Sequence, residues 1–347
     1  MLLVLIMAGA LWGIGSLMGA PRQARLYMIG LLFVAVLGLH LVLPDGHPLR
    51  MATGESAALW LIFGGFVGLV LLYRAVLGRV RAKATLRETA EAPLVRADRF
   101  SEAELERYAR HIVLREIGGP GQKALQHGRV LVIGAGGLGA PALQYLAAAG
   151  VGTIGVIDDD LVENANLQRQ VIHRDRDIGQ PKVFSAEAAM KAQNPYVSVK
   201  PYHRRLEADV AAELFADYDV ILDGTDNFAT RYLANRVAAS LGKPLVSGAL
   251  SQWEGQLSVF DPSSGTPCYQ CIFPEAPAAG LAPSCAEAGV LGPLPGVVGA
   301  MMAVEAIKVL TGAGQALRGE MLIYDALWGE TRKIALKRRD GCSVCDG

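Results

Sequence analysis

The stretch that decides the fold is Val130-Leu-Val-Ile-Gly-Ala-Gly-Gly-Leu-Gly139. Its first four residues are apolar and predict a buried strand, and the glycines that follow let the backbone turn tightly and approach a phosphate. A helix opened by Pro141 would then point its amide end at that phosphate. Asp158 ends the next predicted strand, where a carboxylate can hold ribose hydroxyls. This combination indicates a nucleotide-binding βαβ unit.

After residue 100, predicted strands alternate with predicted helices. The strands are expected at 130–133, 153–158, 197–202, 220–223, 244–247, 256–260, 321–324 and 332–336, and the helices at 101–111, 139–149, 182–193, 208–216, 230–241 and 297–310. The alternation predicts an α/β fold, a Rossmann-like and mostly parallel sheet with helices on both faces. Ligands of such sheets bind at the carboxyl ends of the strands, where 134–139, Asp158 and Asp226 fall.

Several polar residues near these strand ends go beyond what a hydride-transfer enzyme needs: Arg169, Lys182 and Asp226-Asn227. Taken one at a time they have plainer interpretations. Asp158 and Asp160 could cap strand ends, Arg169 and Lys182 could be surface charges, and Asp226-Asn227 could cap the next helix. The residues alone leave these alternatives open.

The order of the motifs narrows the interpretation. It runs Arg107-Tyr-x-Arg-His-Ile112, Gly134-x-Gly-Gly-x-Gly139, Asp158-x-Asp160, Asn166-Leu-Gln-Arg-Gln170, Lys182, Asp223-Gly-Thr-Asp-Asn227, Cys268-x-x-Cys271 and Cys342-x-x-Cys345. From about residue 100 to its end, the chain resembles the ubiquitin-activating-like adenylyltransferases of the HesA/MoeB/ThiF family. Its pattern is most similar to the MoeB branch, the molybdopterin-synthase adenylyltransferases.

The resemblance implies a reaction between ATP and the carboxyl-terminal glycine of a ubiquitin-fold sulfur carrier, which gives an acyl-adenylate and pyrophosphate. The small subunit of molybdopterin synthase, in molybdenum cofactor biosynthesis, is the first choice of carrier, and the thiamine-pathway carrier is the alternative. The sequence also leaves open two other functions, an NAD-dependent oxidoreductase and a membrane-tethered scaffold without catalytic activity. The formal net charge of zero gives no indication of a nucleic-acid partner.

The resemblance also implies roles for particular residues. Arg169 and Lys182 would supply positive charge to the phosphates, and Asp226 would hold Mg²⁺. Arg110 would reach into the neighbouring subunit's site, which implies a homodimer with shared sites. The expected nucleotide-binding residues are Gly134, Gly136, Gly137, Gly139, Asp158, Asp160, Asn166, Leu167, Gln168, Arg169, Lys182, Asp226 and Asn227; the expected catalytic residues are Arg110, Arg169, Lys182 and Asp226.

Cysteines form two distant pairs, Cys268/Cys271 and Cys342/Cys345, with Cys285 left over. Four thiolates suffice for a closed, structural zinc site that ties distant segments together, and the alternative is two unligated reducing pairs. The role of Cys285 stays open between a nucleophile and a plain small residue. Because the chain ends just after Cys345 without a rhodanese domain, sulfur is expected from a separate sulfurtransferase.

Residues 1–80 contain the apolar runs that raise the mean hydropathy to +0.30. Segments 1–20, 27–43 and 57–73 predict about three transmembrane helices, with one segment lying in the interface as the alternative. Residues 81–98 are expected to be a linker and 99–347 the adenylyltransferase domain with its zinc site. This part is therefore expected to be a membrane anchor.

Basic residues flank these segments unevenly. Arg22 and Arg25 follow the first segment, a basic run from Arg74 to Arg87 follows the third, and the intervening connection has no positive excess. The positive-inside rule therefore predicts an inner-membrane protein whose catalytic domain lies on the cytoplasmic side.

Overall fold

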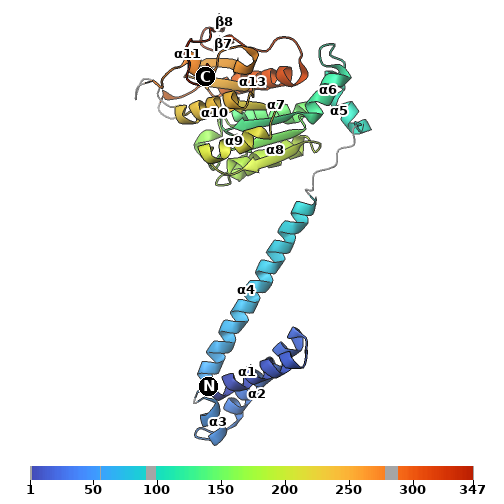
Figure 1. Ribbon diagram of the computed structural model, residues 1–347, viewed down its shortest axis with the longest axis vertical. Coiled ribbons are helices and arrows are strands. Elements are labelled where there is room, and N and C mark those ends of the chain that lie inside the picture. Colours follow the sequence, from blue (N-terminus) through green and yellow to red (C-terminus); the bar gives the residue numbers. More distant parts are fainter. Residues whose placement is uncertain (1, 55, 91–98, 278–287, 347) are drawn as a thin grey trace. The chain divides into compact units, whose positions relative to one another are not determined.

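The computed structural model describes residues 2–54, 56–90, 99–277 and 288–346 (Figure 1). The chain divides into two compact units, Met1–Val95 and Arg96–Gly347. Each unit has its own core and is described here by itself.

The first unit is helical, with α1 (Leu2–Leu17), α2 (Arg22–Val42), α3 (Pro48–Thr53) and α4 (Ala57–Ala90). Each of the three predicted apolar segments falls within a helix, in α1, α2 and α4 respectively. Its small core joins Val4, Val36 and Trp60. By length and composition α2 could cross a membrane, whereas α1 and the apolar part of α4 are shorter.

The predicted linker, 81–98, is in part helical. Helix α4 continues through Ala90, and the rest of the segment lies outside the described residues. The continuation has a physical reason, because 81–90 is rich in Ala, Arg, Lys, Leu and Glu, which all favour helix.

The second unit is built on one sheet of eight strands in the order β3-β2-β1-β4-β5-β6-β7-β8 (Figure 1). The strands are β1 (Arg129–Ile133), β2 (Thr153–Ile157), β3 (Ser198–Tyr202), β4 (Val220–Asp223), β5 (Leu245–Leu250), β6 (Glu254–Phe260), β7 (Glu320–Asp325) and β8 (Glu330–Ala335). The five strands β3, β2, β1, β4 and β5 pair in parallel. Strand β6 pairs antiparallel with β5, and β7 and β8 continue the antiparallel pairing. The predicted fold class, mostly parallel and Rossmann-like, is confirmed.

Helices cover both faces of the sheet, so its central strands are buried on both sides. The helices are α5 (Glu102–Ile112), α6 (Gly118–His127), α7 (Gly139–Ala149), α8 (Lys182–Gln193), α9 (Ala208–Ala216), α10 (Phe228–Ser240), the short α11 (Tyr269–Ile272) and α13 (Pro293–Thr311). In β1, Val130 and Val132 pack in one core with α7, α8 and α13, while Leu131 and Ile133 pack in the other with α9 and α10. Although α13 is apolar enough to cross a membrane, it packs into the first of these cores.

The chain reverses its strand order between β1 and β4. Ile133 is paired with Ile157 of β2 on one side and with Asp223 of β4 on the other, so the three strands end at one level. The loops that leave β1 and β4 diverge to opposite faces, and this divergence opens the crevice in which doubly wound sheets bind ligands.

Most predicted elements are present with small shifts at their ends, but α6 was not predicted. Its first residues, Gly118-Gly-Pro-Gly121, indicate a turn, and Gly118 does have a φ of +60°. Tertiary packing supports the helix, because Leu125 is fully buried and α6 packs against α13. Strand β5 also runs further than predicted, since antiparallel pairing with β6 extends it to Leu250.

Candidate active site

A cleft of about 620 Å³ lies at the carboxyl ends of β1, β2, β4 and β5. It brings together most of the predicted site residues: Gly134, Gly136, Gly137, Asp158, Asp160, Arg169, Lys182, Asp226 and Asn227. Five predicted residues do not line it: Arg110, Gly139, Asn166, Leu167 and Gln168. The cleft also holds Gln170, Arg204, Arg205 and Arg231, which the sequence analysis did not single out.

The glycine loop between β1 and α7 needs glycine at particular positions. Gly134 has a φ of +92°, a left-handed conformation that side chains disfavour. A Cβ atom at Gly139 would lie 1.8 Å from the carbonyl oxygen of Gly134, so only glycine allows this tight return. Gly139 therefore shapes the loop without lining the cleft, while Gly134, Gly136 and Gly137 face the ligand space.

Asp158 holds this loop with its carboxylate. One oxygen accepts a hydrogen bond from the Ala135 amide at 2.7 Å, and the other accepts one from the Asp160 amide at 2.8 Å. Burial raises the pKa of Asp158, while the charge of Lys182 and these amide contacts act in the opposite direction. The carboxylate is thus fixed at the rim of the cleft, where its remaining lone pairs can accept from a ribose.

Lys182 begins α8 and forms an ion pair with Asp160, with a separation of 2.7 Å between Nζ and the carboxylate. Only 5% of the Lys182 side chain is exposed, against 65% for Asp160. The surface-charge alternative for Lys182 is therefore wrong. A buried ammonium with one exposed counter-ion, at the wall of a cleft, can attract a further anion.

Arg169 lies beside Gly137 of the glycine loop, in the turn after the short helix η1 (Asn164–Asn166). Its guanidinium donates to the Asn166 side chain at 3.1 Å and to the Ala165 carbonyl at 3.3 Å. Asn166 thus orients Arg169 rather than lining the cleft itself. Leu167 and Gln168 complete this turn, and Gln168 packs against Gly292.

Asp226 and Asn227, at the start of α10, have different environments. Asn227 caps α10, because its side chain accepts a hydrogen bond from the Thr230 amide at 2.9 Å. Asp226 is exposed at the cleft and makes no hydrogen bond or ion pair within the described parts of the chain. The helix-cap alternative thus fits Asn227, and it leaves the carboxylate of Asp226 available to a ligand.

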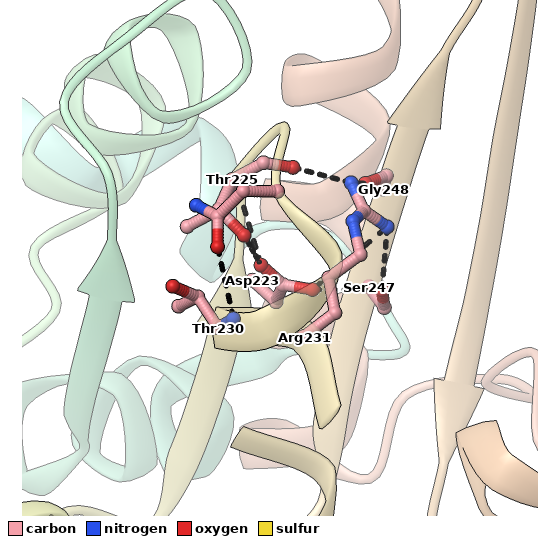
Figure 2. Close-up of polar contacts among 7 residues, drawn as sticks. Asp223, Thr225, Thr230, Arg231, Ser247 and Gly248 are labelled. Atoms are coloured by element: carbon pink, nitrogen blue, oxygen red, sulfur yellow. Dashed lines mark hydrogen bonds and ion pairs between the residues drawn. The ribbon is translucent and has the colours of Figure 1, made fainter. Parts of the chain in front are cut away.

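A buried polar network holds the loop that carries Asp226 (Figure 2). Figure 2 shows the Arg231 guanidinium among Gly248, Ser247 and Thr225. Arg231 donates to the Gly248 carbonyl at 2.7 Å and to the Thr225 carbonyl, and it lies 3.8 Å from the Asp223 carboxylate. Asp223 in turn accepts from the Thr225 hydroxyl at 2.7 Å and from Ser247 at 3.2 Å.

This network was not predicted, although Asp223 stands in one of the quoted motifs. Asp223 is 1% exposed and Arg231 6% exposed, so each charge is desolvated and depends on its partners. Arg231 connects the end of β5 with the residue just before Asp226. The network therefore fixes the position of Asp226 relative to the sheet.

Gln170 is a second residue that sequence analysis missed. It is 4% exposed, lines the cleft, and its side-chain oxygen has no hydrogen-bond partner among the residues that the structure describes. Since buried polar atoms are normally satisfied, this oxygen is suited to a donor from a bound ligand. The quoted run from Asn166 to Gln170 contained it, but only its first four residues were assigned a role.

Arg110 lies in the last turn of α5, exposed and outside the cleft. A surface arginine here could instead pair with Glu106 or Glu116 of its own chain, but Glu116 pairs with Arg115 at 3.2 Å. Within the residues that the structure describes, no ion pair to Arg110 is formed. Its side chain is free to contact another chain.

The four predicted cysteine ligands gather at one point. The Sγ atoms of Cys268, Cys271, Cys342 and Cys345 all lie within 4.8 Å of one another, with Cys268 at 3.8 Å from Cys271 and 3.7 Å from Cys342. Tetrahedral ligands about 2.3 Å from a zinc ion lie about 3.8 Å apart, so the geometry fits zinc. Cys285 lies outside the described residues.

The thiols differ in acidity. Burial raises the pKa of Cys268 to about 12. Burial acts in the same direction on Cys342, but hydrogen bonds from the backbone amides of Val344 and Cys345 and from neighbouring thiols outweigh it and lower the pKa to about 6. Cys342 is thus the more acidic of these two thiols, which favours its thiolate form as a ligand for a metal cation.

A Rossmann-like sheet with a glycine loop, clustered cations and a lone carboxylate at its switch point defines a nucleotide-binding enzyme that acts on phosphates. Residues 108–344 match the model of the ThiF family, and the chain belongs to this family. It is accordingly an adenylyltransferase.

Two relatives match the same part of the chain. The sulfur carrier protein adenylyltransferase of Thermus thermophilus is 49% identical over 251 residues, which are 71% of this chain and 93% of that protein. The SAMP-activating enzyme E1 of Haloferax volcanii is 50% identical over 242 residues, 70% of this chain and 89% of that protein.

The crystal structure of E. coli MccB with MccA-N7isoASN shares the fold, with a TM-score of 0.62 at 21% identity over 70% of this chain and 75% of that one. The two relatives are named as an adenylyltransferase and as an activating enzyme, so the NAD-dependent alternative finds no support.

Proposed function

We propose that this chain uses ATP to adenylate the carboxyl-terminal glycine of a ubiquitin-fold sulfur carrier, the small subunit of molybdopterin synthase. The observation that carries the proposal is the cleft itself, where a glycine loop, two cations and an unpaired carboxylate converge. The relative from Thermus thermophilus, named as a sulfur carrier protein adenylyltransferase, supports the substrate class. A separate sulfurtransferase would then replace the adenylate with sulfur.

In the proposed reaction a carboxylate oxygen of the carrier attacks the α-phosphorus of ATP. The bond between that phosphorus and the oxygen bridging to the β-phosphate breaks, and pyrophosphate leaves with the bonding electrons. Catalysis of such a step is mainly positioning and neutralisation of charge on the phosphates. The glycine loop, whose backbone approaches the nucleotide closely, and the Asp158 carboxylate would position the triphosphate and the ribose.

Arg169 and Lys182 flank the glycine loop and would neutralise the phosphates. Arg169 can donate two parallel hydrogen bonds to phosphate oxygens, while Lys182 acts as a compact charge. Because the Asp160 partner of Lys182 is largely exposed, Lys182 can share its donors with a phosphate oxygen while keeping that ion pair. The two cations would thus face the phosphates from two sides.

Asp226 would hold Mg²⁺, which would neutralise negative charge on the phosphates. The fit rests on an observation, since Asp226 is an exposed carboxylate of the cleft, as are Asp159 and Glu275, and no protein donor within the described residues occupies it. The network around Arg231 would keep it in place as the ion binds.

A protein substrate also fits the surface. Trp253, Leu327 and Trp328 are 41%, 52% and 75% exposed, and the Ala326 amide donates to the Trp253 carbonyl at 2.9 Å, which joins the two turns. Contiguous exposed apolar side chains are typical of sites that bind proteins. This surface would suit a folded carrier better than a free amino acid or small acid.

Exchange of labelled pyrophosphate into ATP tests the proposed function directly. We expect exchange only when a carrier is present, and at least tenfold faster with the molybdopterin-synthase small subunit than with the thiamine-pathway carrier, a difference of about 1.4 kcal/mol. Equal rates, or faster exchange with the thiamine carrier, would reassign the substrate. Exchange with neither would contradict adenylation of either carrier.

Arg110 leads to a proposed homodimer. It is exposed, outside the cleft of its own subunit and without an ionic partner within the described segments. Reaching a phosphate across a dimer interface would add charge that Arg169 and Lys182 leave uncovered. Each site would then contain residues of both subunits.

Complementation between inactive subunits tests the shared site. We expect Arg110→Ala and Asp226→Ala to be inactive alone, but to regain up to about half of the site activity in mixed dimers. In such dimers one site carries both defects and the other carries neither. Absence of any recovery after subunits have exchanged would show that Arg110 acts within its own subunit or not at all.

The helical unit, with α2 long and apolar enough to span, supports a proposed membrane anchor. We expect the full-length chain to pellet with membranes and to resist alkaline extraction, and a chain beginning near Ala97 to be soluble and to retain exchange activity. The catalytic unit should resist protease added outside the cell, because the positive-inside rule, applied to the flanking basic residues, predicts that it lies in the cytoplasm. Full-length protein recovered without detergent would contradict the anchor.

A further inference from the structure

A series of hydrogen bonds supports the glycine loop from outside the residues that line the cleft, and the proposed mechanism does not use it. The His173 ring is 5% exposed. Its Nε2 lies 2.9 Å from the Ala135 carbonyl oxygen, and its Nδ1 lies 2.9 Å from the Ser185 hydroxyl. Ser185 then donates to the Asp177 carboxylate at 2.8 Å.

Ala135 is thereby held on both sides. Its amide donates to the Asp158 carboxylate, and its carbonyl oxygen contacts His173. The neighbours of Ala135 in sequence, Gly134 and Gly136, both line the cleft. Glycines adapt easily to other conformations, so the loop depends on these two tethers to keep its shape.

We propose that His173 is a positioning residue of the glycine loop, which sets the affinity for ATP by holding the Ala135 carbonyl. The inference rests on the proposed function, in that the loop is taken to bind the triphosphate. His173 does not line the cleft, so its effect passes through Ala135. It should therefore alter nucleotide binding more than the chemical step.

The geometry also fixes how many protons this series of hydrogen bonds requires. Three hydrogen bonds join the Ala135 carbonyl, His173, Ser185 and Asp177, and each needs one proton. A neutral imidazole and the serine hydroxyl supply two, since a carbonyl and a carboxylate only accept. Asp177 also accepts from the Arg174 amide at 3.0 Å, which favours its ionised form. A third proton, when it is bound, therefore resides on His173 as the imidazolium.

Charged groups around the ring decide when that proton is bound. Asp177 favours it, whereas burial, the largest effect, and the Lys182 charge oppose it and lower the pKa of His173. Asp158 faces the same Ala135 residue from the end of β2. A bound triphosphate would add negative charge beside the loop and so favour the imidazolium. Binding of ATP is then accompanied by uptake of a proton, and affinity falls as pH rises.

The experiment measures ATP affinity of the full-length protein in detergent by calorimetry, from about pH 6 to about pH 8. His173→Phe keeps the ring but removes both nitrogens, and it should weaken binding about tenfold, because a buried carbonyl loses its donor. In pyrophosphate exchange the same variant should raise KM for ATP while kcat stays within about twofold.

His173→Gln separates positioning from protonation. Its amide can still donate to Ala135 but cannot take up a proton, so it should restore affinity to within about threefold. It should also remove the part of the pH dependence that belongs to His173. The γ-phosphate of ATP titrates equally for both proteins and cancels in the comparison. His127→Gln, at the exposed end of α6, is the matched control and should behave as wild type.

Wild-type affinity in folded His173→Phe, or an unchanged pH dependence in His173→Gln, would overturn the inference. If His173→Phe does not fold, Ser185→Ala gives the same test of protonation, because it removes the hydroxyl that joins His173 to Asp177 by hydrogen bonds. That variant should lose the proton uptake, and its retention would count against the proposal. A wild-type protein that binds no ATP would instead overturn the proposed function.

Discussion

Replacement of Asp226 with alanine is expected to abolish pyrophosphate exchange, with a loss of about a hundredfold or more. Asp226 supplies a full negative charge at the cleft and makes no hydrogen bond or ion pair within the described residues. Removing it costs the fold nothing that the structure shows, so the variant should unfold at the wild-type temperature. The measurement is exchange of labelled pyrophosphate in the presence of the carrier.

Two further variants define the cause. Asp226→Asn keeps the size of the side chain but removes the charge, and it should be nearly as inactive, because Mg²⁺ prefers a charged oxygen ligand. Asp217→Ala removes an equally exposed carboxylate at the end of α9, away from the cleft, and should leave exchange unchanged. Near-normal exchange by a folded Asp226→Ala protein would contradict the assignment.

Elements with a strong local signal could be predicted from the sequence. The apolar run at 130–133 is long enough to indicate a buried strand, and α7 has the predicted bounds 139–149, with Gly150 ending it at a φ of +83°. The convergence of site residues followed from topology alone, because parallel strands end at the same edge of the sheet. The glycine loop, Asp158 and Asp226 therefore came together without any knowledge of side-chain contacts.

Roles that depend on burial or on distant partners could not be predicted. Nothing in the local sequence distinguishes Asn227, which caps a helix, from Asp226 beside it, which makes no hydrogen bond or ion pair within the described residues. Arg231 resembles any helical arginine until its neighbours on β5 are known. His173 likewise acquires its contact with Ala135 across 38 residues of chain. Such roles arise from tertiary structure rather than from motifs.

The cysteine cluster is the other feature where a single change should have a large effect. Cys342→Ser is expected to reduce bound zinc from about one per chain to well below half, and to lower the free energy of unfolding by several kcal/mol. Cys268 immediately precedes α11 and Cys271 lies within it. Cys342 and Cys345 follow β8 near the carboxyl terminus. A bound metal would join these segments, since Cys268 and Cys342 are 74 residues apart yet 3.7 Å from each other.

Loss of the zinc should also affect the cleft, because α11, which contains Cys271, contributes to the cleft wall. Tyr269 and Phe273, in and just after α11, both line the cleft. Loss of the metal would free this wall, so Cys342→Ser should also raise KM for ATP or for the carrier. Ser343→Ala, an exposed neighbour in the same turn, is the matched control and should retain both zinc and stability. Metal analysis and urea unfolding measure the two effects, and a metal-free Cys342→Ser protein as stable as wild type would exclude a structural zinc site.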